Sequence, residues 1–219
     1  MEKKFLYQYF LNNSGRVIHK WSHYFEIYEK FFSIFRNREI LMIEIGVDKG
    51  GSLLMWKEFF GEKAKIVGLD INPECKLFED KEKNIFVEIG SQSDEVFLDS
   101  IIKKFGTPHI ILDDGGHVCS DQKKTFEHLF HELHEGGIYF VEDLHTSYWE
   151  ESGGGFRNSE SFIEFVKNKI DEINAEHTRG RQEKTRFTNY INGMSIYDSV
   201  VIFEKRKQGK KLSIQTGDY

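Results

Sequence analysis

The sequence contains little cysteine and proline and has no long apolar run. Its 219 residues include 2 Cys and 2 Pro. Cys75 and Cys119 cannot build a disulfide framework, which indicates a reducing compartment. No apolar run approaches the roughly 20 residues of a membrane helix, and residues 1–17 lack the continuous apolar stretch of a signal peptide. We therefore expect a cytoplasmic protein with no membrane-bound part.

The charge balance and the aromatic content limit the class further. Acidic residues exceed basic ones by 36 to 30, a formal charge of −6. This sign argues against nucleic acid as the main partner, because a phosphate backbone attracts basic proteins. Aromatic residues make up 15% of the chain, including 20 Phe, which a disordered chain would lack. The length suits one large globular domain of enzyme size.

Short apolar runs alternate with helical patterns along the chain. The runs are β-branched and aromatic-rich, as in strands that are buried on both faces. They cover residues 40–47, 65–71, 85–89, 109–112 and 137–141. Between them, residues 52–60, 94–105 and 120–134 carry apolar side chains at spacings of three and four. The repeat predicts an α/β fold with a Rossmann-like, doubly wound and mostly parallel sheet.

The two ends of the chain differ from this central repeat. Residues 20–35 are aromatic and helical in period, so we expect residues 1–36 to form a helical lid or packing segment. Residues 193–205 predict an antiparallel β-hairpin that turns at residues 197–199 and closes the central domain, residues 37–205. The basic residues after position 205 indicate a solvated, disordered tail over 206–219.

A glycine-rich loop follows the first predicted strand. Residues 44–52 read E-I-G-V-D-K-G-G-S, and a glycine turn between strand and helix lets a ligand approach the backbone. Asp48 stands where the second glycine of the dinucleotide fingerprint belongs. Its side chain would obstruct and repel a pyrophosphate, which weakens the case for NAD. A tight turn with no ligand is the alternative.

An acidic residue ends the second predicted strand. Asp70 is placed to accept hydrogen bonds from the two hydroxyls of a ribose, although it could instead cap a loop. Together with the glycine loop, it favours a nucleoside cofactor that does not require diphosphate binding. S-adenosylmethionine (SAM) fits this description.

Four carboxylates follow two later strands. Asp113 and Asp114 come after residues 109–112, and Glu142 and Asp143 come after residues 137–141. If these strands are neighbours, the carboxylates meet at one edge of the sheet, where they require a cation or raised pKa values. Oxygen ligands favour Mg²⁺, Mn²⁺ or Ca²⁺. The alternatives are a capping aspartate and pairing with basic residues.

Several of these stretches carry a family resemblance. The glycine loop and G-L-D-I-N-P at 68–73 resemble class I SAM-dependent methyltransferases. Three further stretches resemble the metal-dependent macrolide-sugar O-methyltransferases and the related cephalosporin hydroxylase-like proteins. These are L-D-D-G-G-H at 112–117, V-E-D-L-H-T-S-Y-W at 141–149 and S-I-Y-D-S-V-V-I-F-E-K at 195–205.

The resemblance implies roles for individual residues. Mg²⁺ or Mn²⁺ would be held by Asp114, Glu142 and Asp143, with His117 as the general base. The residues expected at SAM are Glu44, Gly46, Asp70, Gln92 and Asp113. His145 and Tyr148 follow the metal ligands and could line the acceptor pocket, with a structural role equally open.

The resulting hypothesis is transfer of a methyl group from SAM to a hydroxyl of a sugar or a glycosylated or nucleotide-linked metabolite. A divalent ion would orient the hydroxyl and lower its pKa, and an imidazole, which titrates near neutral pH, would take its proton. A nucleotide-dependent oxidoreductase and a non-catalytic SAM-binding partner protein remain alternatives. The aromatic N-terminal segment is compatible with a homo-oligomer.

Overall fold

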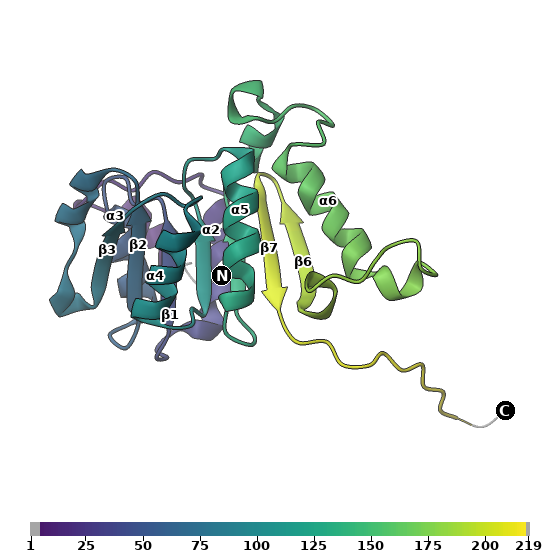
Figure 1. The fold of residues 1–219 in the computed structure, drawn as a ribbon. Helices are drawn as coiled ribbons and strands as arrows, with labels where there is room; N and C mark the ends of the chain where they lie inside the picture. Colours follow the sequence, from purple (N-terminus) through teal and green to yellow (C-terminus); the bar gives the residue numbers. More distant parts are fainter. Residues whose placement is uncertain (1–4, 218–219) are drawn as a thin grey trace.

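The computed structural model describes residues 5–217, which form a seven-stranded sheet between two layers of helices (Figure 1). The strand order is β3-β2-β1-β4-β5-β7-β6. Strands β1 to β5 are parallel, and β7 runs antiparallel to both of its neighbours. The strand bounds are β1 Leu41–Ile45, β2 Lys65–Asp70, β3 Ile85–Ile89, β4 Ile110–Asp113, β5 Ile138–Val141, β6 Ile191–Tyr197 and β7 Val200–Lys205.

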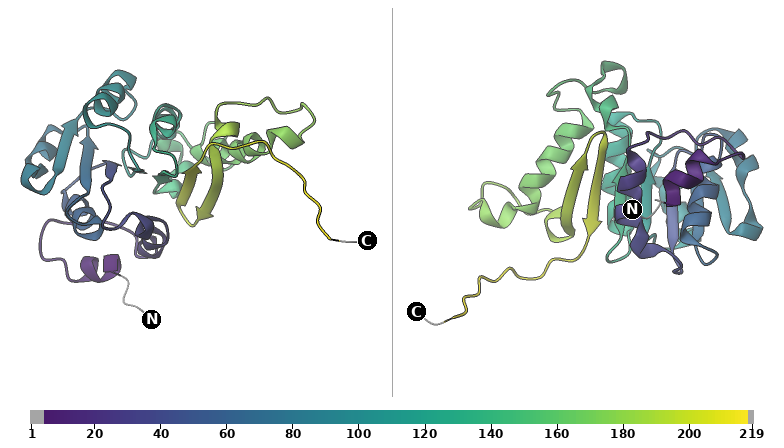
Figure 2. Two further views of the ribbon diagram at one scale, coloured as in Figure 1. Left: turned by 90° about the horizontal axis from the view of Figure 1, so that it is seen from below. Right: turned by 180° about the vertical axis from the view of Figure 1, so that it is seen from behind.

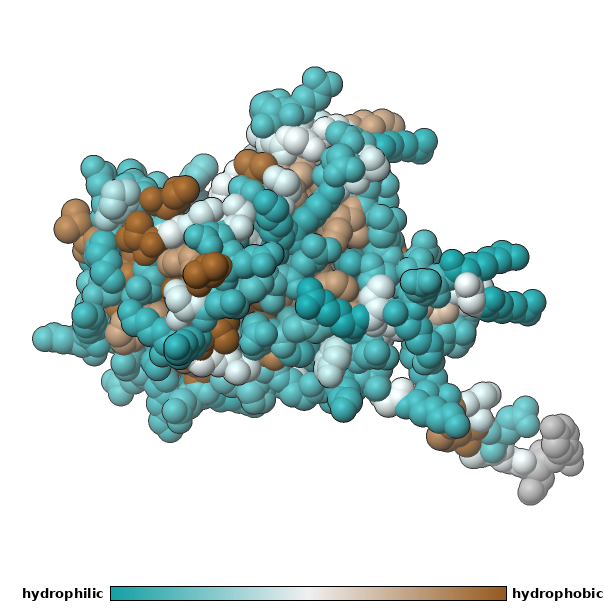
Figure 3. Space-filling view, viewed as in Figure 1, coloured by the Kyte–Doolittle hydropathy of each residue, from teal (hydrophilic) through white to brown (hydrophobic). Residues whose placement is uncertain are grey.

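Each face of the sheet is covered by three helices (Figure 2). One face carries α1 (Phe5–Leu11), α2 (Tyr24–Phe32) and α3 (Gly51–Phe60), which bury an aromatic core against the sheet that includes Tyr28, Trp56 and Phe140. The other face carries α4 (Glu95–Phe105), α5 (Cys119–Leu129) and α6 (Phe162–Ile173), whose core includes Phe126, Tyr139 and Phe203. The surface seen from the side of Figure 1 is mostly hydrophilic, with apolar residues in small groups (Figure 3).

Local signals in the sequence set the helix ends. The Asp94 carboxylate accepts hydrogen bonds from the backbone N–H groups of Val96 and Phe97 at the start of α4, and the helix stops at Gly106. Ser161 caps α6 in the same way by accepting from the backbone N–H of Glu164. Over residues 5–217, no helix is long and apolar enough to cross a membrane.

The predicted α/β fold is confirmed, including the C-terminal hairpin and its two-residue turn at Asp198 and Ser199. The five predicted strands appear within two residues of their expected ends. Three differences concern helices. Helix α2 begins at Tyr24, because residues 17–20 form no regular secondary structure and Lys20 is held by Asp114 and Glu142 at the sheet edge. Helix α5 ends at Leu129 and continues as a 3-10 turn, and α6 has no predicted counterpart.

The register of the strands brings the predicted site residues to one edge. Asp113 is level with Ile45 of β1 and with Val141 of β5. The loops that follow β1, β4 and β5 therefore start side by side. In an open α/β sheet this edge, where the strand order reverses between β1 and β4, is where ligands bind.

Candidate functional site

A cavity of about 470 Å³ lies at the carboxyl edge of the sheet. Loops that follow β1, β2, β3 and β4 line it, and an N-terminal strap, residues 17–20, closes one side. Its lining includes Gly46, Asp70, Gln92, Asp114, His117 and Asp143. Six residues predicted from the sequence as site residues therefore meet around one space, whose volume suits a small-molecule ligand.

Gly46 makes the close approach between the loops after β1 and β4 possible. Its φ is +92°, and a Cβ atom built on it would lie 2.0 Å from the carbonyl oxygen of Asp114. Any side chain here would therefore push these loops apart, in addition to the strain of the left-handed backbone. Gly46 thus sets the spacing between the cavity wall and the acidic cluster.

Asp70 both fixes the glycine loop and lines the cavity. Its Oδ2 accepts hydrogen bonds from the backbone N–H groups of Val47 at 2.8 Å and Asp48 at 3.2 Å. Its Oδ1 accepts from the backbone N–H of Asn72 at 2.8 Å. Asp70 therefore does cap the loop, as the alternative in the sequence analysis expected. Its carboxylate oxygens still have lone pairs that can accept hydrogen bonds from a ligand.

Gln92 lies at the cavity wall, and Asp113 lies beneath it. The Gln92 amide accepts from the backbone N–H of Gly116 at 2.9 Å and donates to Asp113 at 3.2 Å. Asp113 is completely buried and, among the described residues, is not part of the cavity lining. Burial raises the pKa of its carboxyl group to about 7. Asp113 supports Gln92 from below.

Glu44 is buried on the face of the sheet that carries α3, opposite to the face on which Asp113 lies. Its carboxylate accepts hydrogen bonds from Ser52 Oγ and Trp56 Nε1, both at 2.9 Å. Burial raises its pKa to about 7, against the opposing effect of the Lys20 ammonium. Like Asp113, it is outside the lining of the cavity formed by the described residues.

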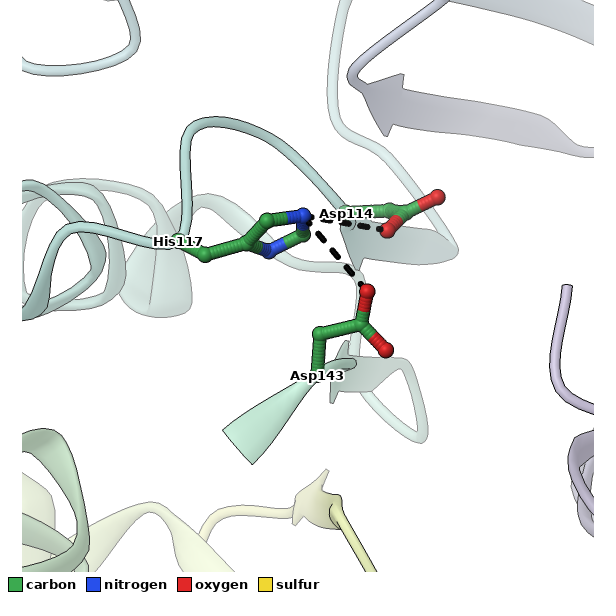
Figure 4. Close-up of side chains that lie close together, drawn as sticks. All are labelled: Asp114, His117 and Asp143. Carbon is green, nitrogen blue, oxygen red and sulfur yellow. Dashed lines mark ion pairs between the residues drawn. The ribbon is translucent and has the colours of Figure 1, made fainter. Parts of the chain in front are cut away.

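Three side chains, those of Asp114, His117 and Asp143, point toward one another and form a cluster (Figure 4). His117 Nε2 lies 3.5 Å from Asp143 Oδ2 and 3.9 Å from Asp114 Oδ1. One ligand atom of each residue lies within 4.8 Å of the others, a spacing that could hold a metal ion. His117 Nδ1 is buried and has no hydrogen-bond partner among the described residues.

Two of these three residues have strained backbones. The φ angles are +53° at His117 and +54° at Asp143, in the left-handed region that non-glycine residues rarely adopt. Each such residue costs of the order of 1 kcal/mol or more, and strain of this kind concentrates at functional sites. The local backbone therefore holds the imidazole and the carboxylate together at a cost in stability.

Glu142 is engaged by residues from the N-terminal part of the chain. Lys20 Nζ lies 2.9 Å from Glu142 Oε2, contacts Asp114 Oδ2 and lies 3.9 Å from Glu44 Oε1. Tyr28 donates its hydroxyl to Glu142 Oε1 at 2.5 Å. The sequence analysis gave pairing with basic residues as an alternative to a metal site. In this structure Glu142 does pair with a basic residue, Lys20.

Burial and these pairs act in opposite directions on the pKa values. Burial raises the pKa of Asp114 and of Glu142, and the Lys20 ammonium counteracts the rise. Burial alone would lower the pKa of Lys20, yet the surrounding carboxylates raise it above its usual value. Lys20, whose side chain is 3% exposed, is therefore the charged partner of the cluster.

Sequence reasoning missed Lys20 and Tyr28 as site residues, and it considered Tyr24 only as part of a lid over a ligand, with no link to the acidic cluster. Tyr24 donates its hydroxyl to Asp143 Oδ1 at 2.7 Å, and burial raises the pKa of that hydroxyl. Positions 20, 24 and 28 are four residues apart and each carries a hydrogen-bond donor, but other polar residues in the same stretch share no such role, so the sequence alone did not single them out. Their partners lie more than 90 residues away in the chain.

A smaller cavity of about 180 Å³ adjoins the acidic cluster. It shares His19, Lys20, Asp114 and Asp143 with the large cavity and is otherwise lined by Trp21, Ser22, Tyr24 and Glu142. His145 and Tyr148 lie in the 3-10 turn after β5. His145 Nδ1 is 4.0 Å from Asp143 Oδ1, whereas the Tyr148 side chain is half exposed.

Comparison with known proteins agrees with the resemblance seen in the sequence. The chain is 33% identical over 192 residues to mycinamicin VI 2''-O-methyltransferase of Micromonospora griseorubida, covering 81% of this chain and 47% of the relative. It is 30% identical over 193 residues to 8-demethyl-8-alpha-L-rhamnosyl tetracenomycin-C 2'-O-methyltransferase of Streptomyces olivaceus, covering 84% and 50%. No protein-family model matches the chain.

The fold comparison gives the same result. The solved structure of the MycE methyltransferase in complex with Mg, SAH and mycinamycin VI superimposes with a TM-score of 0.80 at 29% identity. The match covers 93% of this chain and 53% of MycE. The chain thus spans about half the length of the relatives that it matches.

Proposed function

Starting from this kinship with the macrolide-sugar O-methyltransferases and from its class I methyltransferase fold, we propose that the protein transfers a methyl group from SAM to a sugar hydroxyl on a small molecule. The observation that carries the proposal is the junction of two cavities at one cluster. The large cavity meets the small one at Asp114 and Asp143, with His117 beside both carboxylates.

The large cavity would take SAM. Asp70 and Gln92 offer polar groups along its wall, and Gly46 lines it where the loops after β1 and β4 approach each other. Asp48 stands where a diphosphate-binding loop carries a glycine, and its side chain would obstruct and repel a diphosphate. This fits a cofactor without phosphate. Glu44 and Asp113 would act from outside the cavity by holding the β1 and β4 ends in place.

Asp114, Glu142 and Asp143 would hold Mg²⁺ or Mn²⁺. Of these three carboxylates, Asp114 and Asp143 lie at metal-ligand spacing in the structure, together with the His117 imidazole, and carboxylate oxygens are the ligands that such an ion prefers. Glu142 lies beside them, bound to Lys20. Two of these carboxylates are already gathered on a cation, the Lys20 ammonium. A bound divalent ion would act as a Lewis acid that lowers the pKa of the acceptor hydroxyl. Its binding by all three carboxylates requires Lys20 to give up part of its contacts.

His117 would take the proton of the acceptor hydroxyl. The oxygen would attack the methyl carbon as the bond from carbon to sulfur breaks, which would leave S-adenosylhomocysteine (SAH), and the hydroxyl proton would pass to His117 Nε2. The Asp143 carboxylate, 3.5 Å from that nitrogen, stabilises the imidazolium that forms. The strained backbone at both residues supports this role, because it fixes the base next to its counter-charge.

We also propose that the protein works in the cytoplasm. Cys75 and Cys119 are both free and buried, as expected for a protein that works in a reducing compartment.

A thermal-shift comparison of SAM, SAH and NAD tests the cofactor assignment. Ligands that bind only the folded state raise its melting temperature. We expect SAM and SAH to raise it, and Gln92→Ala to reduce both shifts. Stabilisation by NAD alone would refute the proposal and favour a nucleotide-dependent oxidoreductase.

A further inference from the structure

We propose that Tyr24 and Tyr28 make the metal site of Asp114, Glu142 and Asp143 selective for Mg²⁺ and Mn²⁺ over Ca²⁺. Each hydroxyl occupies one oxygen of a carboxylate, which leaves Asp143 and Glu142 one oxygen each for an ion. This inference rests on the proposed function and deepens it, because it assigns the choice of ion to two residues that are not ligands themselves. Both tyrosines are positioning residues, which act through the carboxylates that they hold.

The two hydroxyls reach the carboxylates from one helix. Tyr28 donates to Glu142 Oε1 at 2.5 Å, and Tyr24 donates to Asp143 Oδ1 at 2.7 Å. The two tyrosines lie about one turn apart on α2, whereas Glu142 and Asp143 are consecutive residues after β5. Helix α2 therefore supplies one hydroxyl to each of two neighbouring carboxylates.

The remaining oxygen of each carboxylate faces a different group of the site. Glu142 Oε2 lies 2.9 Å from the Lys20 ammonium, and Asp143 Oδ2 lies 3.5 Å from His117 Nε2. The contact with Lys20 shows that Glu142 holds a cation at one oxygen while Tyr28 keeps the other. An ion that replaces the ammonium would find the same single oxygen.

Dense packing fixes the two hydroxyls in place. Both tyrosine side chains are completely buried. The Tyr28 ring packs against Trp56 with centroids 5.0 Å apart and against Phe140 at 5.3 Å, and the Tyr24 ring lies 6.2 Å from it. Rings in a close-packed core cannot follow a carboxylate that rotates. Presenting the second oxygen to an ion would therefore leave a buried hydroxyl without its acceptor, which is unfavourable.

The hydroxyls are not needed to fill the core. Helix α2 also buries Phe25, Phe31 and Phe32, whose side chains pack without a polar atom. A phenylalanine at position 28 would occupy nearly the same volume and avoid the cost of burying a hydroxyl. The bond to Glu142 is therefore what the tyrosine adds.

The ions differ in how many oxygens they need. Ca²⁺ takes about six to eight oxygen ligands in a flexible arrangement, and a carboxylate can give it both oxygens. Mg²⁺ is smaller, needs a near-octahedral arrangement and keeps several waters, and Mn²⁺ also suits octahedral oxygen sites. Two phenols that each hold one carboxylate oxygen remove ligands that Ca²⁺ could use. The single, fixed oxygens that remain suit Mg²⁺ and Mn²⁺.

Ion affinities of the metal-free protein, measured without SAM or acceptor, test this selection. EPR of free Mn²⁺ gives the Mn²⁺ affinity, and competition against Mn²⁺ gives the affinities for Mg²⁺ and Ca²⁺. We expect Tyr28→Phe to weaken Mg²⁺ and Mn²⁺ binding about 10- to 100-fold and Ca²⁺ binding by less than about threefold, because the freed Glu142 oxygen offsets the loss for Ca²⁺. The displacement of Lys20 is common to all three ions and cancels in the ratio of affinities.

Two further variants complete the experiment. Tyr24→Phe should shift the ratio in the same direction through Asp143, and it carries the test if Tyr28→Phe does not fold. Tyr139→Phe is the matched control, because it removes a buried hydroxyl that lies 3.4 Å from Asp113 Oδ2, a carboxylate outside the proposed ligand set. Its affinities for all three ions should equal those of the unaltered protein.

The outcomes separate this inference from the proposed function. Equal weakening of Mg²⁺ and Ca²⁺ in both tyrosine variants, unchanged affinities, or tighter binding of Ca²⁺ than of Mg²⁺ by the unaltered protein would overturn the selection. Methyl transfer from SAM to a sugar-bearing acceptor would leave the proposed function standing in each of these cases. Absence of methyl transfer to every such acceptor contradicts the proposed function and leaves the measured ion ratio as it is. Failure of the unaltered protein to bind any of the three ions overturns the metal assignment and this inference together.

Discussion

At the scale of single residues, His117 joins a chemical role to an unfavourable backbone. Its imidazole lies beside both Asp114 and Asp143, and its φ is +53°. Replacement by asparagine, which tolerates this region, removes the base and keeps the backbone. We expect His117→Asn to change the unfolding free energy by less than about 1 kcal/mol and to lower kcat by about 10²- to 10⁴-fold. Denaturant unfolding and steady-state kinetics check this, and an unchanged kcat would exclude His117 as the base.

A pair of glycines separates close packing from backbone strain. Gly46 and Gly106 both have φ +92°, but a Cβ atom on Gly46 would meet the Asp114 carbonyl at 2.0 Å, whereas one on Gly106 meets nothing within 4 Å. We expect Gly106→Ala to cost about 1–3 kcal/mol for the backbone alone, because its φ of +92° and ψ of −166° are essentially restricted to glycine. Gly46→Ala should cost clearly more and weaken SAH binding. Equal losses in unfolding experiments would show that the close approach is unimportant.

His131 predicts a pH dependence of stability that is independent of the site. Burial lowers its pKa to about 4, with Arg186, Lys205 and Lys169 acting in the same direction. Between pH 4 and 6.5 the unfolded chain therefore binds a proton that the folded protein does not, so stability falls as the pH falls. The loss is at most about 3 kcal/mol. His131→Phe keeps the ring beside Phe187 and should flatten this part of the curve; a parallel loss in both proteins would contradict the assignment.

The residues of the site differ in how far the sequence could predict them. Asp114, His117 and Asp143 are brought together by strand register, because the carboxyl ends of adjacent parallel strands meet. Lys20 could not be predicted as their partner, since the contact joins segments 94 residues apart through a loop. The aromatic pattern around it indicated packing and gave no information on its charge partner.

At the scale of elements, the N-terminal strap is held to the sheet edge by the Lys20 ammonium. Removing one member of a buried ion pair costs about 3–5 kcal/mol, because the other charge is left uncompensated. We expect Lys20→Met to lower the melting temperature in EDTA and Mg²⁺ to recover much of the loss, since the ion would neutralise Asp114 and Glu142. The stabilisation by Mg²⁺ should be larger in this variant than in the unaltered protein.

A surface lysine provides the control for this experiment. Lys83 is 60% exposed and pairs with Asp80 at 3.2 Å, so Lys83→Met should change stability by less than about 1 kcal/mol, with no added response to Mg²⁺. An equal Mg²⁺ response in both lysine variants would refute the assignment of the ion to this cluster.

The elements themselves followed from the sequence where the pattern was regular. Strands buried on both faces gave continuous apolar runs, and α4 followed from apolar side chains at spacings of three and four over residues 94–105. Helix α6 was missed although Ser161 caps it, because it lies outside the regular alternation of strands and helices. The helical pattern was predicted to start at residue 20, whereas α2 begins at Tyr24 and residues 20–23 lie outside it.

At the scale of the whole molecule, the class of fold was predictable and the strand order at one edge was not. Strands that alternate with helices are joined by right-handed crossovers and run parallel. This rule predicts the common direction of β1 to β5. A C-terminal hairpin can join a sheet by either strand, and here β7 inserts between β5 and β6. That insertion places the turn with Ser199 beside His145, next to Asp143.

The central claim is methyl transfer from SAM to a sugar hydroxyl at the cluster of Asp114, His117 and Asp143. The most direct test is mass spectrometry of sugar-bearing acceptors, with mycinamicin VI and a rhamnosyl tetracenomycin as the first probes, after incubation with SAM and Mg²⁺. We expect a product heavier by one added methylene (about 14 Da, one methyl replacing one hydrogen), a strong reduction by EDTA, and near-complete loss in His117→Asn. Methylation that persists unchanged in EDTA and in His117→Asn would contradict the account.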